Sequence, residues 1–224
     1  PFTQSKTANV GSGFFDGDTT STTERSTTGD KVFTTSTSSD FAFGTGDFTV
    51  ECWVYPNGSV TDARNILSNR NAGSDTVWAL HYSGAAHNQL HWHTGATAVA
   101  NSSPHKVIPN AWNHLAVTRE SGTARMYING VQVATWSDSY NYSTDFNLDI
   151  AEEIYTNSFN GYIADAHIIK GTAKYTGASS FSIPTSTISA DSNTKFLALQ
   201  YSGAVRNQGF LDDGKYNSIV VPTS

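Results

Sequence analysis

Cysteine is almost absent from this sequence of 224 residues, in which Cys52 is the only one. A single cysteine excludes an internal disulfide, and no Cys/His spacing typical of a zinc site occurs. The G-x-S-x-G motif of a nucleophilic serine is missing as well. Cys52 lies in the apolar register of an expected strand, which predicts a buried and unreactive thiol.

Positive charge and long apolar runs are also scarce. Thirteen Lys and Arg residues stand against 19 Asp and Glu residues, which gives a formal net charge of -6. Without a basic run or stripe, the chain lacks the electrostatic footprint of a nucleic-acid-binding protein. No segment approaches the run of about 18 apolar residues that a membrane-spanning helix needs, so we expect no membrane insertion.

Alternating apolar and polar side chains are the dominant pattern that is present. The clearest expected strand is 48–56, where Phe48, Val50, Cys52 and Val54 face one side and the intervening residues face the other. Further strands are predicted at 76–82, 89–93, 112–119, 124–128, 131–136, 159–169 and 195–201. No segment has a convincing helical periodicity.

The pieces between these strands are rich in Gly, Asn, Ser and Asp, which are turn-forming residues. Asn129-Gly130 between two alternating runs is a strong hairpin signal. Residues 16–30, 94–111 and 137–146 are expected to be long loops. Many short strands joined in this way indicate an all-β, antiparallel β-sandwich of the jelly-roll kind.

Four segments resemble, in content and order, the laminin-G-like, concanavalin A-like lectin-glucanase domains. They are "DFTVECWVYP" (47–56), "ILSNR" (66–70), "WNHLAVTRESGTARMYINGVQVAT" (112–135) and "FNGYIADAHIIKGTAKYT" (159–176), preceded by "SGFFDGD" (12–18). The resemblance implies a sandwich domain at 1–185. Residues 186–224 are then a C-terminal extension or inter-module connector that completes or leaves the sandwich.

A narrower resemblance concerns modules in structural proteins of tailed, especially marine, bacteriophages. It rests on "SSDFAFGTGDFTVECWVYP" (38–56), "IIKGTAKYT" (168–176) and "LALQYSGAVRNQGFLDDGKYN" (197–217). This resemblance implies a tail fibre or capsid decoration protein on the virion surface, outside the cell. Its expected partners are virion structural proteins, and we expect repeated copies or a homo-oligomer in the assembly.

The family resemblance also implies a structural calcium site formed by Asp16, Asp18 and Asp165, because carboxylates suit calcium. The chain departs from the family at Ala151, which replaces a glycine, and at Ala164, which replaces an acid often found beside Asp165. The alternative is that Asp165 accepts hydrogen bonds from backbone or an arginine, while Asp16 and Asp18 stabilise turns.

Three histidines, His81, His91 and His93, are expected on the polar side of the hairpin formed by 76–82 and 89–93. Antiparallel pairing places His81 opposite His91 or His93. Such a trio suits a transition metal, a pH switch, or contact with a glycan or a protein. An ordinary solvated sheet face is the other reading. His114 is expected to be structural and bonded to neighbouring backbone.

The loop at 135–146 combines aromatic and polar side chains. The rings of Trp136, Tyr140 and Tyr142 suit stacking on sugar faces, while Asn141 suits bonding to hydroxyls, as do the nearby aspartates. Contact with another protein and packing within the module are the alternatives.

Catalysis is not expected. A glycosidase needs two facing carboxylates about 5–10 Å apart, whereas Glu152 and Glu153 are adjacent and Glu51 is alone on its strand. We therefore expect a non-catalytic virion surface module that acts in adhesion to cell-surface carbohydrate. The alternative is a purely structural virion subunit, and a glycan-cleaving enzyme is a distant third.

Overall fold

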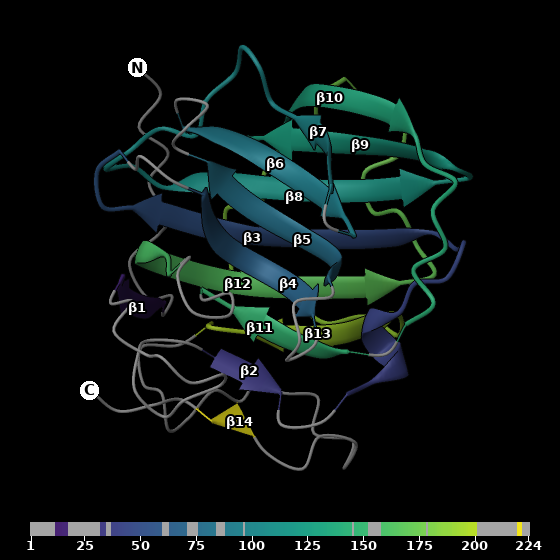
Figure 1. Ribbon diagram of the computed structural model, residues 1–224. Coiled ribbons are helices and arrows are strands. Elements are labelled where there is room, and N and C mark those ends of the chain that lie inside the picture. Colours follow the sequence, from purple (N-terminus) through teal and green to yellow (C-terminus); the bar gives the residue numbers. More distant parts are fainter. Residues whose placement is uncertain are drawn as a thin grey trace.

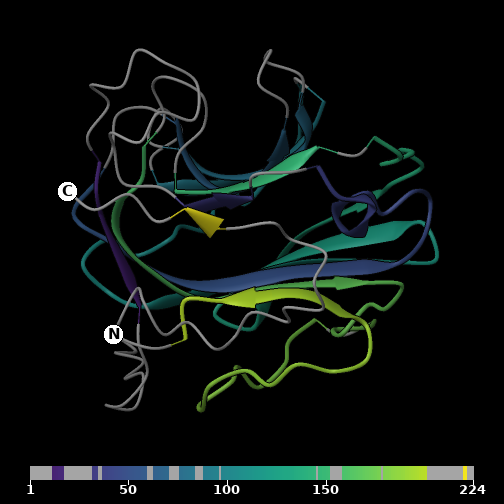
Figure 2. The same cartoon turned by 90° about the horizontal axis from the view of Figure 1, so that it is seen from below.

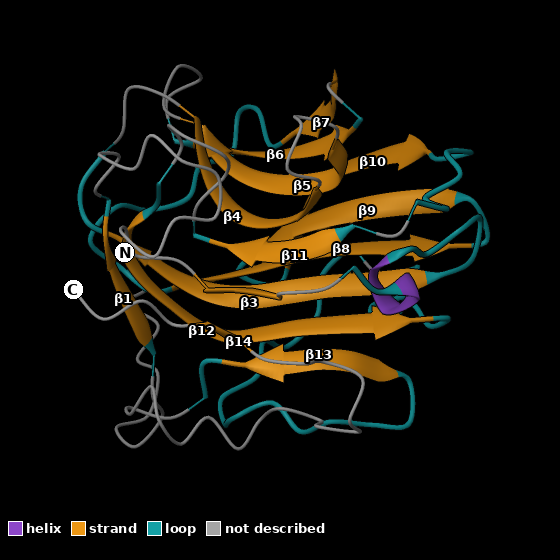
Figure 3. Cartoon of the chain, turned by 60° about the horizontal axis from the view of Figure 1, so that its bottom comes forward, coloured by secondary structure: helices purple, strands orange, loops and turns teal. Residues whose placement is uncertain are grey.

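The computed structural model describes residues 12–17, 32–34, 37–59, 63–70, 76–83, 88–95, 97–144, 146–151, 158–177, 179–200 and 219–220. These residues form two antiparallel sheets stacked face to face (Figures 1 and 2). In the described part, one short 3-10 helix, η1 (Ser39–Phe41), accompanies the strands (Figure 3). The predicted all-β antiparallel sandwich is confirmed.

The sheet behind in Figure 1, called the back sheet, has seven strands. Their order is β1 (Gly13–Asp16), β12 (Asn160–Lys170), β3 (Phe48–Pro56), β8 (Asn113–Glu120), β9 (Thr123–Ile128) and β10 (Val131–Ser137). The seventh strand, β13 (Thr194–Ala198), also pairs with β12, beyond the residues that pair with β1.

The front sheet also has seven strands. Their order is β14 (Ile219–Val220), β2 (Val32–Thr34), β11 (Asn147–Ile150), β4 (Ala63–Arg70), β5 (Thr76–Ser83), β6 (Gln89–Thr94) and β7 (Thr97–Asn101). Within the described ranges, no helix has the length and apolar character needed to cross a membrane.

Most predicted strands match observed ones within three residues at each end. β7 lies within the predicted loop at 94–111. Its sequence shows no apolar alternation, and all of its residues are exposed or half-buried in the structure. The last expected strand was 195–201, but β14 follows it and pairs with β2. Strands on a sheet edge and strands of two to four residues give too few buried positions for a periodic signal.

The core lies between the sheets. Phe48, Val50, Cys52 and Val54 are fully buried there, as the alternation predicted. Trp78 and Trp92 stack with ring centroids 5.5 Å apart in the same core. Burial raises the pKa of the Cys52 thiol well above its usual value, so this cysteine is an inert core residue.

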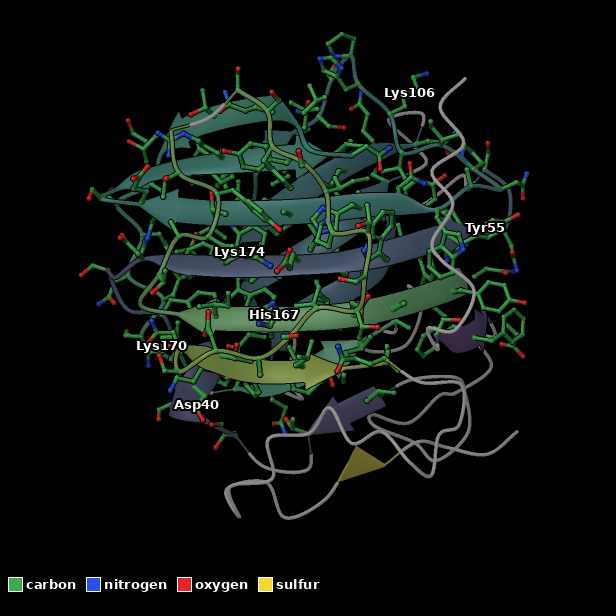
Figure 4. All side chains as sticks on the ribbon, turned by 180° about the vertical axis from the view of Figure 1, so that it is seen from behind. Asp40, Tyr55, Lys106, His167, Lys170 and Lys174 are labelled. Carbon is green, nitrogen blue, oxygen red and sulfur yellow. The ribbon has the colours of Figure 1, made fainter. Side chains whose placement is uncertain are left out.

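The opposite face of β3 is buried too, which the alternation alone does not predict. Residues 171–177 and 179–193, here called the strap, run across the outer face of the back sheet (Figures 2 and 4). Thr49 bonds to the backbone of Thr172 and Lys174 in the strap. The strap thus covers polar side chains that would otherwise face solvent.

Candidate functional site

A pocket of about 380 Å³ lies beside β7 and β10. These two strands are edge strands of the two sheets and lie next to each other in Figure 1. It is lined by Thr94, Val99, Trp136, Ser137, Asp138, Ser139, Tyr140 and Asn141. Three of the predicted ligand residues, Trp136, Tyr140 and Asn141, therefore meet in one cavity. Asn141 is exposed, and Tyr140 presents an accessible ring with 40% of its surface exposed.

The loop that forms this pocket is held by Arg119, a fully buried arginine on β8. Its Nη1 donates to the carbonyl oxygen of Tyr140 at 2.9 Å, and its Nε and Nη2 donate to the carbonyls of Gly46 and Gly44. The guanidinium fork thus joins the loop before β3 to the loop after β10. Sequence reasoning missed Arg119, although it continues the apolar register of Leu115 and Val117, which is an unusual place for a charge.

Asp138 and Tyr142 support the pocket from the inside. The Tyr142 hydroxyl donates to Asp138 Oδ2 at 2.9 Å and accepts from Trp92 Nε1 at 3.2 Å. Asp138 Oδ2 also lies 3.6 Å from Nη1 of Arg119. Tyr142 is fully buried, and burial raises the pKa of its hydroxyl. The expectation that Tyr142 stacks on a ligand is therefore corrected, because its ring packs edge-on against Tyr140 instead.

The three histidines lie together on the outer face of the front sheet. His81 pairs with His91, and the rings of His81 and His93 are 4.4 Å apart. Burial lowers the pKa of His93 to about 4, with a further contribution from His91, and burial also lowers the pKa of His91. The two β6 histidines are therefore neutral at pH 7.

Polar side chains of neighbouring strands lie beside the histidines on this face, but they are buried, as is His81. Asn65 pairs with His81, and Ser68 pairs with both Ala79 and Asp149, so the polar positions continue from β6 to β11. Within the described ranges, no group of three or more His, Cys, Asp or Glu side chains is placed to hold a metal ion. His91 and His93 are half-buried, so these two rings are the accessible part of the histidine cluster.

The acids predicted to share calcium do not converge where the structure describes them. Asp16 pairs with Asn160, and Asp165 lies five residues further along β12, a separation of roughly 16 Å on an extended strand. Asp165 is buried at a β-bulge with a φ of 48° and accepts from Gln200 Nε2 at 3.3 Å. Asp16 and Asp165 therefore cannot ligate one ion, which corrects that expectation. Asp18 lies outside the described residues.

Glu51 is the centre of a buried polar cluster that the sequence did not reveal. Its Oε1 lies 2.6 Å from Lys174 Nζ and 2.8 Å from His167 Nδ1, while its Oε2 lies 2.6 Å from the Tyr175 hydroxyl. His114 Nε2 lies 3.1 Å from the same Oε2, so His114 bonds to this carboxylate rather than to the expected neighbouring backbone. Figure 4 shows His167 and Lys174 on this face of the back sheet.

The cluster determines the charge of Glu51. Burial opposes ionisation, but the hydrogen bonds from His114 and His167, with the positive charge of Lys174, hold the pKa of Glu51 well below its usual value. An ionised carboxylate only accepts hydrogen bonds, so all four partners donate to it. Both oxygens of the buried Glu51 carboxylate are thereby occupied, which suits a structural role.

The family model of the concanavalin A-like lectin/glucanases superfamily matches residues 14–174. The chain belongs to this superfamily. The matched range includes the pocket loop, Glu51 and the strands from β2 to β12, while β13 and β14 lie beyond it. A search of curated protein sequences gives no match.

Two solved structures show how this superfamily fold is shared. A candidate carbohydrate binding protein from Bacteroides ovatus has a TM-score of 0.59 and 14% identity, with 86% of this chain and 52% of that chain covered. A heptameric SAP-like pentraxin from Limulus polyphemus has a TM-score of 0.51 and 14% identity, with 71% of this chain and 75% of that chain covered. The chain spans about half the length of the Bacteroides protein, and at these identities the likeness concerns the fold.

Proposed function

We propose that this chain is a non-catalytic carbohydrate-binding module that acts in adhesion. The main support is the pocket beside β7 and β10, where the exposed ring of Tyr140 lies near Asn141 and the hydroxyl residues Ser137 and Ser139. A sugar offers an apolar face and a rim of hydroxyls, and a site with an aromatic wall and a few polar groups matches both. The description of the Bacteroides ovatus protein is consistent with this proposal.

The half-buried rings of His91 and His93 add a second polar area on the same module. The neutral rings of His91 and His93 each have one donor and one acceptor nitrogen, which suits bonding to sugar hydroxyls. Their neutrality at pH 7 favours an uncharged ligand over a phosphate or sulfate.

We place the module on the surface of a tailed-phage virion, in a tail fibre or a capsid decoration protein. The support is the resemblance of residues 38–56, 168–176 and 197–217 to phage structural modules. Virion structural proteins are then its partners, and repeated copies raise the avidity of a weak sugar site. The alternative function is a purely structural subunit that packs against other virion proteins without binding glycan.

A glycan array with the labelled chain tests the carbohydrate proposal. We expect binding to a subset of neutral cell-surface glycans, and an affinity at least about tenfold lower for Tyr140→Ala, because one stacked ring is lost. Val131→Ala is the matched control, since Val131 is 50% exposed on β10 and does not line the pocket. Wild-type protein that binds no glycan would favour the structural subunit.

The virion placement needs a separate measurement. Antibodies raised against the purified chain should label the outside of phage particles from the source material in immunogold electron microscopy. Labelling of host cells alone would contradict the placement and leave the carbohydrate proposal intact.

A further inference from the structure

Four aromatic side chains form a row across four neighbouring strands of the back sheet. Phe14 on β1 pairs with Tyr162 on β12, which pairs with Tyr55 on β3. Trp112 comes directly before Asn113, whose partner is Val54, so Trp112 lies opposite Tyr55. Successive ring centroids are 5.0, 6.0 and 5.8 Å apart. Three strand spacings give the row a length of about 14 Å.

The row lies on the outer face of the sheet and is accessible. Phe14 is 52% exposed and Tyr162 is 37% exposed, while Tyr55 and Trp112 are half-buried. Ser12, Tyr55, Trp112 and Tyr162 line a cavity of about 260 Å³. Figure 4 labels Tyr55 at the end of β3, on the side of the molecule away from the front sheet.

A row of polar side chains runs directly beside the aromatic row. Asp16, Asn160 and Asn57 each lie two residues from a ring of the row, and the alternation of a strand therefore puts them on the same face. Asp16 pairs with Asn160, and Asn57 Nδ2 donates to Asn160 Oδ1 at 3.0 Å. An apolar strip and a strip of amide and carboxylate groups thus lie side by side.

We propose that this surface is a second carbohydrate site, which binds a neutral glycan chain lying across β1, β12, β3 and β8. Sugar rings present apolar faces to aromatic rings, and stacking of this kind tolerates different sugars. Their hydroxyls then lie over the polar strip. Among the described residues that line the cavity there is no lysine or arginine, so an anionic ligand is not favoured.

This site is separate from the pocket beside β7 and β10. β1 and β10 are the two ends of the strand order in the back sheet, and the aromatic row covers the β1 half. The inference therefore goes beyond the proposed function, because one module would hold glycan at two places. Two sites on one rigid sandwich raise the avidity for a repeating polysaccharide.

Affinity gel electrophoresis of the intact chain tests the second site. The gels contain dextran, laminarin, galactomannan, xyloglucan or xylan as the probe. We expect at least one polysaccharide to retard the wild type. For the double variant with Phe14→Ser and Tyr162→Ser, the dissociation constant for that polysaccharide should be about tenfold or more higher. Tyr162→Phe keeps the ring and should retain most of the binding.

Two controls separate this proposal from protein damage and from the pocket. Val131→Ser removes an equally exposed apolar side chain from the same sheet and should leave retardation unchanged. Equal melting temperatures of the variants by circular dichroism would exclude unfolding. Tyr140→Ala reports on the pocket alone.

Several outcomes would overturn the proposal. If Tyr140→Ala abolishes retardation and the double variant retains it, the aromatic row is not a sugar site, while the proposed function stands. A second outcome concerns the oligomeric state in sedimentation velocity. If the wild type is a dimer and the double variant is a monomer that the polysaccharide still retards, the aromatic row is an interface between copies of the chain. If no polysaccharide retards the wild-type protein, both proposed carbohydrate sites are wrong.

Discussion

Lys174 Nζ lies 2.6 Å from Oε1 of Glu51, and this ion pair connects the strap to the middle of the back sheet. Glu51 is fully buried, whereas one third of the Lys174 side chain is exposed. Tyr175, the next residue of the strap, donates to the other carboxylate oxygen. One carboxylate therefore fixes the strap on the sheet through two consecutive residues.

Glu51→Gln should lower the free energy of unfolding by about 3 kcal/mol, because removing one member of a buried ion pair leaves the other charge uncompensated. The glutamine side chain would also place its NH2 group, a hydrogen-bond donor, against partners of Glu51 that are donors themselves. Urea unfolding measures the change. The control is Glu120→Gln, which removes a partly exposed pair with Arg125 and should cost less than about 1 kcal/mol. Equal costs for both variants would contradict the central role of Glu51.

The stability should decrease as the pH is lowered from about 6.5 to about 4, partly through His93. Burial lowers the pKa of His93 to about 4 in the folded protein, whereas an unfolded histidine titrates near pH 6.5. Between these values the unfolded chain binds more protons, so acid favours unfolding. Denaturant unfolding at several pH values should give a flatter profile for His93→Gln. The exposed His105, replaced by Gln, serves as the control, and identical profiles for both variants would refute this prediction.

Arg119→Lys should destabilise the protein by about 3 kcal/mol and weaken binding at the pocket. An ammonium group cannot reproduce the planar fork that bonds the carbonyls of Tyr140, Gly44 and Gly46. Arg125→Lys is the matched control on the neighbouring strand, where the side chain is partly exposed and the expected cost is below about 1 kcal/mol. Unfolding in urea and titration with a glycan found on the array measure the two effects.

Asp165→Asn should lower the melting temperature by the same amount in calcium and in EDTA. The acid is held by Gln200 at the β-bulge and lies far along β12 from Asp16. Thermal melts of both proteins in the two buffers give the comparison. A loss of stability that appears only with calcium would show that Asp165 is a ligand after all.

The local pattern of the sequence was sufficient for most of the fold. The alternation in 48–56 and the Asn129-Gly130 turn predicted β3 and the β9–β10 hairpin, because strand and turn preferences depend on neighbours in the chain. The aromatic loop at 135–146 was likewise visible, and three of its four proposed ligand residues line the pocket. The exception is Tyr142, since sequence does not say which ring of an aromatic loop turns inward.

Only the tertiary structure decided which distant residues meet. Phe14, Tyr55, Trp112 and Tyr162 become one row through the register of strands far apart in the sequence. Glu51 gained His114 and His167 from the neighbouring strands β8 and β12, and Lys174 and Tyr175 from the strap that covers this face of the sheet. The period of a strand fixes the side on which a residue emerges, but the sheet order, the register and the covering segments result from packing of the whole chain. For that reason the sequence determined the sandwich and its aromatic loop, while the structure decided the Arg119 support, the Glu51 cluster and the separation of Asp16 from Asp165.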